Sequence, residues 1–132
     1  MKIRPKASCG CGSAPNVVVC CSGASDTAEI GDRAARLLSR EGAAKMSCLA
    51  GVGGGVDTIL SNIKKSLLIL AIDGCDTDCS KKVMEQAGFT DVIHIRVTDL
   101  GMVKGETPVT EENIQKVASQ ARSALGIATV SA

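Results

Sequence analysis

Apolar and polar positions follow one another along the chain in blocks that predict strands and helices in turn. The clearest block follows Ser66, where residues 67–72 form an unbroken apolar run with no polar side. A strand that is apolar on both sides is buried on both sides, which is typical of the centre of a parallel sheet covered by helices. Asp73 and Gly74 then turn the chain, and residues 81–87 have the pattern of a helix that follows the strand.

Three further strands and three further helices are predicted around this central unit. The strands are expected at residues 16–20, 44–49 and 91–97, the last with the alternation of a half-buried strand. The helices are expected from Asp26 to the glycine at 42, at residues 56–63 and from Thr110 to Gly126. Asp26 and Glu29 have the spacing of a capping box at the start of the first helix. Residues 50–55 are predicted to form a glycine-rich loop.

The alternation of strands and helices indicates an α/β fold. Right-handed crossovers and short connections favour a three-layer sandwich with a mainly parallel four-stranded sheet, Rossmann-like or flavodoxin-like, in the order 2-1-3-4. We expect a flexible N-terminal segment at residues 1–15 and a single α/β domain at residues 16–132. Residues 127–132 fit either a frayed end or a short extra strand.

Composition and charge remove several classes of function. The formal charge is +1, from 15 basic and 14 acidic residues, and the only aromatic residue is one Phe. Neither electrostatics nor aromatic stacking therefore favours nucleic acid as a partner, and the charge gives no attraction to an anionic membrane. No apolar run approaches the roughly 20 residues of a membrane span, and residues 17–21 are too short for a secretory signal. We expect a cytoplasmic protein.

Seven cysteines stand out against this aliphatic background. An odd number without a secretion signal favours metal or thiol chemistry over a disulfide scaffold. Cys21 and Cys75 follow two of the predicted strands, Cys48 lies at the end of a third, and Cys79 lies four residues beyond Cys75. In a parallel sheet these strand ends open on the same edge, so the four side chains can converge. Four thiolates suit a tetrahedral site for a soft metal ion, most often zinc.

Other residues have simpler interpretations. Cys20 continues an apolar strand and is expected in the core, where free cysteine behaves as a small apolar residue. Cys9 and Cys11 lie ahead of the first strand, either as a metal-acquiring arm or, as we favour, in an unstructured end without a role.

The polar residues near the strand ends allow two interpretations. His94, the single histidine, lies inside an alternating strand and is expected on the strand face rather than as a ligand. Asp73 and Asp99 follow strands, where each either caps a turn or serves the site as an acceptor or general base.

Three motifs resemble those of the DGC-domain family: residues 21–25 (Cys-Ser-Gly-Ala-Ser), residues 46–51 (Met-Ser-Cys-Leu-Ala-Gly), and residues 72–75 (Ile-Asp-Gly-Cys) followed by Cys79. Residues 98–101 (Thr-Asp-Leu-Gly) are similar to a further pattern of that family, and the resemblance covers residues 17–104. Family members are described as zinc-binding proteins with a proposed site of four cysteines, and no biochemical role is assigned to them. The resemblance implies Cys21, Cys48, Cys75 and Cys79 as zinc ligands.

Two hypotheses for function follow, and the residues do not decide whether the protein is an enzyme. In the first, the four cysteines hold Zn²⁺ in a closed site with a structural, storage or sensing role. In the second, Cys75 and Cys79 perform thiol redox or sulfur-carrier chemistry. A third arrangement joins them, with three thiolates on the metal and one open position, and an iron or iron-sulfur centre is a further alternative. The number of cysteines favours zinc, because two would suffice for redox chemistry.

Overall fold

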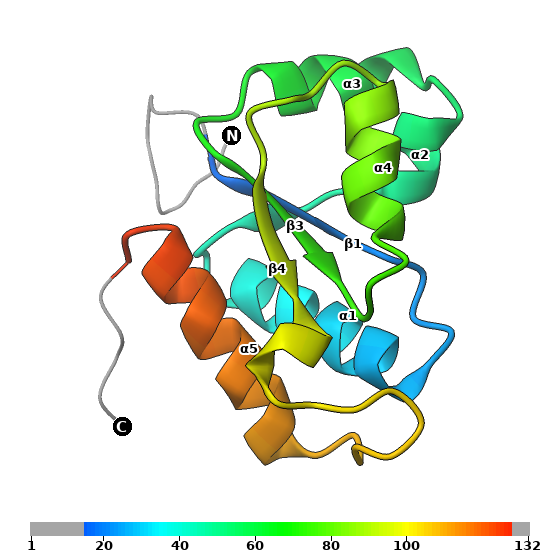
Figure 1. Cartoon of the computed structure of the whole chain (residues 1–132). Helices are drawn as coiled ribbons and strands as arrows, with labels where there is room; N and C mark the ends of the chain where they lie inside the picture. The colour runs from blue at the N-terminus through cyan, green and yellow to red at the C-terminus, as the bar shows by residue number, and fades with distance from the viewer. Residues whose placement is uncertain (1–14, 128–132) are drawn as a thin grey trace.

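The structure is a computed structural model that describes residues 15–127, and it confirms the predicted α/β fold. Its four-stranded sheet is parallel throughout and has the predicted order β2-β1-β3-β4 (Figure 1). The strands are β1 (Val17–Cys20), β2 (Lys45–Met46), β3 (Ile69–Asp73) and β4 (Ile93–Arg96). The helices are α1 (Asp26–Arg40), α2 (Leu49–Gly53), α3 (Asp57–Lys64), α4 (Cys79–Gln86), α5 (Glu111–Ala124) and the short 3₁₀ helix η1 (Val97–Leu100).

Helices cover both faces of the sheet, which gives three layers. Figure 1 shows α1 and α5 on one face, and α2, α3 and α4 on the other. Alternate residues of β3 serve the two cores: Leu70 and Ile72 pack towards α1 and α5, whereas Ala71 packs towards α2, α3 and α4. Leu70 and Ile72 are fully buried, and each contributes roughly 1.5–3 kcal/mol to folding. The apolar run in the sequence was therefore correctly interpreted as the central strand.

The glycine-rich stretch was predicted wrongly as a loop, because residues 49–53 form α2. Glycine disfavours helix by about 1 kcal/mol per residue, so the local pattern gave no helix signal. Here the Sγ of Cys48 accepts a hydrogen bond from the N–H of Gly51, and Val52 is buried in the core. Capping and burial thus outweigh the low helix propensity of the glycines.

Several element boundaries also differ from the prediction. The cap of α1 is Ser25, whose Oγ accepts from the N–H of Ala28, rather than Asp26. The second strand shrinks to two residues, and α4 begins at Cys79, two residues earlier than its apolar pattern indicated. The helix ends at Gly42 and Gly126 are confirmed, and both glycines have positive φ angles.

Some expectations fall outside the described residues. Cys9, Cys11 and residues 128–132 are among them, so the flexible N-terminal segment, the choice between a frayed end and an extra strand, and the domain limits remain predictions. Within residues 15–127, none of the helices has the length and apolar character needed to cross a membrane.

Candidate functional site

The parallel sheet brings the ends of β1, β2 and β3 to one edge of the molecule. Cys21 follows β1 directly, Cys48 lies two residues after β2, and Cys75 lies two residues after β3. Cys79 is the first residue of α4. The strand order places β1 between β2 and β3, so these segments are neighbours, as the sequence analysis expected. Ligands in open α/β sheets bind at this edge.

Gly74 joins the loops after β1 and β3. Its N–H donates a hydrogen bond to the Sγ of Cys21, at 3.4 Å. A Cβ at position 74 would lie 2.5 Å from the backbone nitrogen of Ala28, so only glycine allows the loop to pack on the first turn of α1. Burial raises the pKa of the Cys21 thiol, while hydrogen bonds from the N–H groups of Gly74 and Gly23 oppose that rise.

Cys75 lies in the opposite electrostatic environment. Its Sγ is 3.4 Å from the Oγ1 of Thr77 and 3.6 Å from the Nζ of Lys104. The hydrogen bond with the Thr77 side chain is the main cause that lowers the pKa of Cys75, and the positive charge of Lys104 adds to it. Gly105, which follows Lys104, donates its N–H to both carboxylate oxygens of Asp26 at 2.9 Å. These bonds hold the loop that carries Lys104 against the start of α1.

Cys48 and Cys79 are exposed and lie at the starts of two helices. The Sγ of Cys48 is 3.3 Å from the N–H of Gly51, the bond that caps α2. Cys79 begins α4, where the positive end of the helix dipole favours a negative charge. Both thiols are therefore accessible from solvent at the same edge of the sheet.

The structure brings the four cysteines to one edge but does not bring three of their sulfur atoms into one cluster. In a tetrahedral zinc site with Zn–S bonds of about 2.3 Å, the sulfurs lie about 3.8 Å apart. Among residues 15–127, the only group of three or more potential ligands with atoms within 4.8 Å of one another is Asp73, Asp78 and His94. Ligation by the four cysteines therefore remains a prediction.

Asp73 organises a buried polar network that sequence reasoning missed. Its carboxylate is 1% exposed and accepts hydrogen bonds from the N–H groups of Ser80 (2.7 Å) and Lys81 (3.1 Å). It also lies 2.8 Å from the Nε2 of His94. Asp73 thus accepts hydrogen bonds from the N–H groups in the first turn of α4. The side chain of Asp78, at the N-cap position, makes no such bond. Of the two roles expected for Asp73, capping is confirmed.

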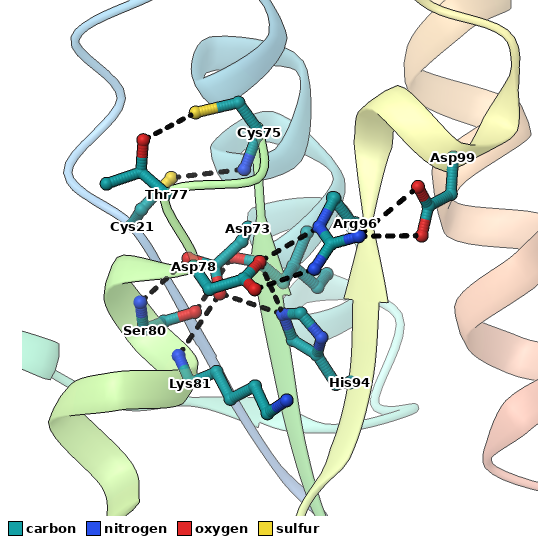
Figure 2. A network of polar contacts seen from close by, with 12 residues as sticks. Cys21, Asp73, Cys75, Thr77, Asp78, Ser80, Lys81, His94, Arg96 and Asp99 are labelled. Carbon is teal, nitrogen blue, oxygen red and sulfur yellow. Dashed lines mark hydrogen bonds and ion pairs between the residues drawn. The ribbon is translucent and has the colours of Figure 1, made fainter. Parts of the chain in front are cut away.

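Arg96 completes the network from the neighbouring position on the same face of β4. Its Nε and Nη2 bind the two carboxylate oxygens of Asp78 at 2.9 and 2.6 Å, and its Nη1 is 3.5 Å from those of Asp99 (Figure 2). Arg96 also holds the pKa of Asp78 below its usual range. All four oxygens of Asp73 and Asp78 already accept hydrogen bonds, so this group is an ion-pair network rather than a vacant cation site.

One sequence signal could have found the network. His94 and Arg96 occupy the polar positions of the alternating strand, on the same face as each other. The register pairs Arg96 with Asp73 and His94 with Ala71, which points all of these side chains towards α4. The alternating pattern identified the polar side of β4. The partners of His94 and Arg96 depend on the register of β3 against β4, which the local pattern does not give.

Cys20 is a core residue, as predicted. Its side chain is 7% exposed, and its Sγ donates to an oxygen of Asp32 at 3.4 Å. Burial, together with the negative charge of Asp32, raises the pKa of this thiol to about 12. Cys20 is therefore protonated at neutral pH and unsuited to bind a metal or attack a disulfide.

Comparison with known proteins identifies the family. The model of the DGC domain matches residues 17–121. Over 88 aligned residues the chain is 34% identical to the "Anaerobic and virulence modulator AnvM" of Pseudomonas aeruginosa. This alignment covers 67% of each of the two chains. No solved structure matches the chain. The family match spans all three strand-end motifs and the four cysteines, and the chain belongs to the DGC-domain family.

Proposed function

We propose that the protein binds Zn²⁺ through Cys21, Cys48, Cys75 and Cys79. One observation carries the proposal: the sulfurs of Cys21, Cys48 and Cys75 follow three parallel strands that open on one edge, and each lies beside a hydrogen-bond donor. Donors of this kind stabilise metal-bound thiolates, and they are the backbone N–H groups of Gly74 and Gly51 and the side chain of Lys104.

The donor set fits zinc in its chemistry. Thiolates are soft ligands, and four of them complete the tetrahedral shell of Zn²⁺. Binding would draw the sulfurs closer together, and the exposed side chains of Cys48 and Cys79 can rotate without losing buried contacts. A shell of four thiolates leaves no position for a reactive water, so the role we propose is structural, storage or sensing.

Among these roles, the relative favours sensing. The matched protein of Pseudomonas aeruginosa is named an anaerobic and virulence modulator. Oxidation of a thiolate to a sulfenic acid or a disulfide removes a metal ligand, so metal occupancy of a four-thiolate site reports the presence of oxidants. In a modulator connected with anaerobic conditions, such a site would sense oxidants.

The second candidate is thiol redox or sulfur-carrier chemistry at Cys75 and Cys79. The lowered pKa of Cys75 favours this residue as the attacking thiolate. It would form a mixed disulfide with a disulfide substrate and release one substrate thiolate. The thiolate of Cys79 would then displace the second substrate thiol and leave a Cys75–Cys79 disulfide.

Cobalt substitution tests the first proposal against the second. The chain has no Trp and no Tyr, so thiolate-to-cobalt charge-transfer bands in the near ultraviolet are free of protein absorption. We expect these bands in the metal-free, reduced chain after addition of one equivalent of Co²⁺, and we expect Cys75→Ser to weaken them. The control is Cys20→Ala, which removes a buried thiol outside the proposed site. Bands that are absent, or unchanged in Cys75→Ser, would contradict zinc binding at these residues.

A further inference from the structure

The segment from Cys75 to Cys79, which we term the Cys75–Cys79 loop, is tied to strand β4 through one side chain. Arg96 binds both carboxylate oxygens of Asp78, which stands directly before Cys79 (Figure 2). The exposed fractions of the Arg96 and Asp78 side chains are 27% and 12%, so the pair is largely shielded from water. A two-point contact between a planar guanidinium and a carboxylate fixes orientation as well as distance.

Asp78 has an unusual backbone. Its φ angle is +55°, and it is the only residue other than glycine with positive φ in the part of the chain that the structure describes. A residue with a Cβ adopts this left-handed conformation at a cost, which neighbouring contacts must offset. The side chain of Asp78 makes no capping hydrogen bond to α4. It forms the ion pair with Arg96 instead.

The left-handed residue sets the path of the chain between the two thiols. The N–H of Asp78 donates to the carbonyl of Cys75 at 3.2 Å, and the carbonyl of Asp78 accepts from the N–H of Lys82 at 2.9 Å. One bond closes the turn that carries Cys75, and the other begins the helix that carries Cys79. Asp73, held by His94, anchors the other end of the same segment.

We propose that Arg96 is a positioning residue for the site: by holding Asp78 in its left-handed conformation, it fixes the relative placement of Cys75 and Cys79. Lysine and glutamine cannot reproduce the two-point contact. The expected effect of Arg96 on zinc affinity rests on the proposed function. Its effect on the conformation of the Cys75–Cys79 loop can be measured without a metal.

The first measurement is the zinc dissociation constant of the full chain, by competition with a chelator under reducing conditions. We expect Arg96→Gln to bind zinc about tenfold more weakly, which is the scale on which outer partners of metal ligands act. Arg122→Gln is the matched control, because Arg122 forms a 2.8 Å ion pair with Glu41 between α5 and the end of α1. We expect this control to lose stability without a change in zinc affinity.

A double variant separates positioning from a general loss of stability. Glycine adopts positive φ without help, so Asp78→Gly removes the ion pair but permits the same backbone. In the Asp78→Gly background we expect Arg96→Gln to have no further effect on zinc affinity. An equal additional loss in that background would overturn the inference, because Arg96 would then act on the site by another route.

Amide hydrogen exchange of the metal-free, reduced chain tests the positioning role of Arg96 independently of zinc. We expect the amides of Asp78 and Lys82 to exchange at least several-fold faster in Arg96→Gln than in Arg122→Gln. If the natural chain binds no zinc, the proposed function fails, and faster exchange at these two amides still supports positioning by Arg96. Unchanged exchange at both amides would overturn it, whatever the result with zinc.

Discussion

Two junctions between a strand and a helix deliver cysteines to the same edge of the sheet, and they are built in different ways. The β3–α4 junction follows the buried central strand, and side chains of β4 hold it through Asp73 and Asp78. The β2–α2 junction follows a strand of two residues at the sheet edge, where the thiol of Cys48 itself caps the helix.

The difference indicates which part of the site the fold prepares in advance. The Cys75–Cys79 loop is ordered by tertiary contacts that need no ligand, whereas Cys48 is exposed and makes one local hydrogen bond within its own turn. Metal binding would therefore fix the exposed side chain of Cys48 against a β3–α4 junction that already has its shape. Ordering a segment on binding reduces the affinity gained from its contacts.

The largest expected effect is a difference between the cysteines of the two junctions. We expect Cys79→Ser to weaken zinc binding by more than roughly 100-fold, beyond the usual effect of losing an outer partner. Cys48→Ser should cost less, about tenfold, because the exposed side chain at this position no longer has to be ordered on binding. Serine is a good helix cap, so this variant keeps α2. Zinc competition titrations of both variants measure the difference, and equal losses would contradict the comparison.

The second effect concerns the stability of the two junctions. Alanine at Gly74 would place its Cβ 2.5–2.9 Å from the backbone of residues 27 and 28, which cannot move aside as a flexible side chain can. We expect Gly74→Ala to lower the free energy of unfolding by about 3 kcal/mol. Gly53 in α2 is the control, because its added Cβ would make an ordinary 3.7 Å contact with Val83.

For Gly53→Ala we expect a gain of about 0.5 kcal/mol, the usual preference of a helix for alanine. Urea unfolding of the metal-free chain measures both variants. The account of the β3–α4 junction would be contradicted if Gly74→Ala were as stable as Gly53→Ala.

The smallest effect concerns the loop that carries Lys104 to Cys75. The N–H of Gly105 holds the pKa of Asp26 below its ordinary value of 3.8. A carboxyl group with a lowered folded-state pKa stabilises the fold above pH 3.8, and this stabilisation is lost as the pH falls through the folded-state value.

Asp26→Asn should therefore be slightly less stable than the natural chain at pH 6, and the gap should narrow below pH 3.8. Unfolding by urea at a series of pH values tests this, and a gap independent of pH would contradict the role given to the Asp26 carboxylate. The effect is small because Asp26 lies at the surface.

The sequence predicted the parts of the fold that depend on local pattern and chain topology. The apolar run at residues 67–72 identified the central strand, and the alternation of strands and helices led to the order 2-1-3-4. Glycines of positive φ after α1 and α5 marked where those helices end. The elements and their ends follow from residues that are close in sequence, and the strand order follows from right-handed crossovers and short connections.

The features that the sequence did not predict depend on residues brought together by the fold. Asp78 and Arg96 are 18 positions apart, and Asp73 and His94 are 21 apart. Their pairing follows from the register of β3 against β4, which no local pattern specifies. In the same way, the carboxylate of Asp26 was expected to cap α1 but binds Gly105, and Ser25 takes the capping role.

The measurement that tests the central claim most directly is the zinc content of protein purified without oxygen, together with a count of its thiols before and after chelation under denaturing conditions. We predict about one zinc per chain and five thiols that react only after chelation and denaturation, namely the four proposed ligands and the buried Cys20. A chain without metal, in which Cys75 and Cys79 form a reversibly reducible disulfide, would contradict the zinc proposal and support thiol redox chemistry.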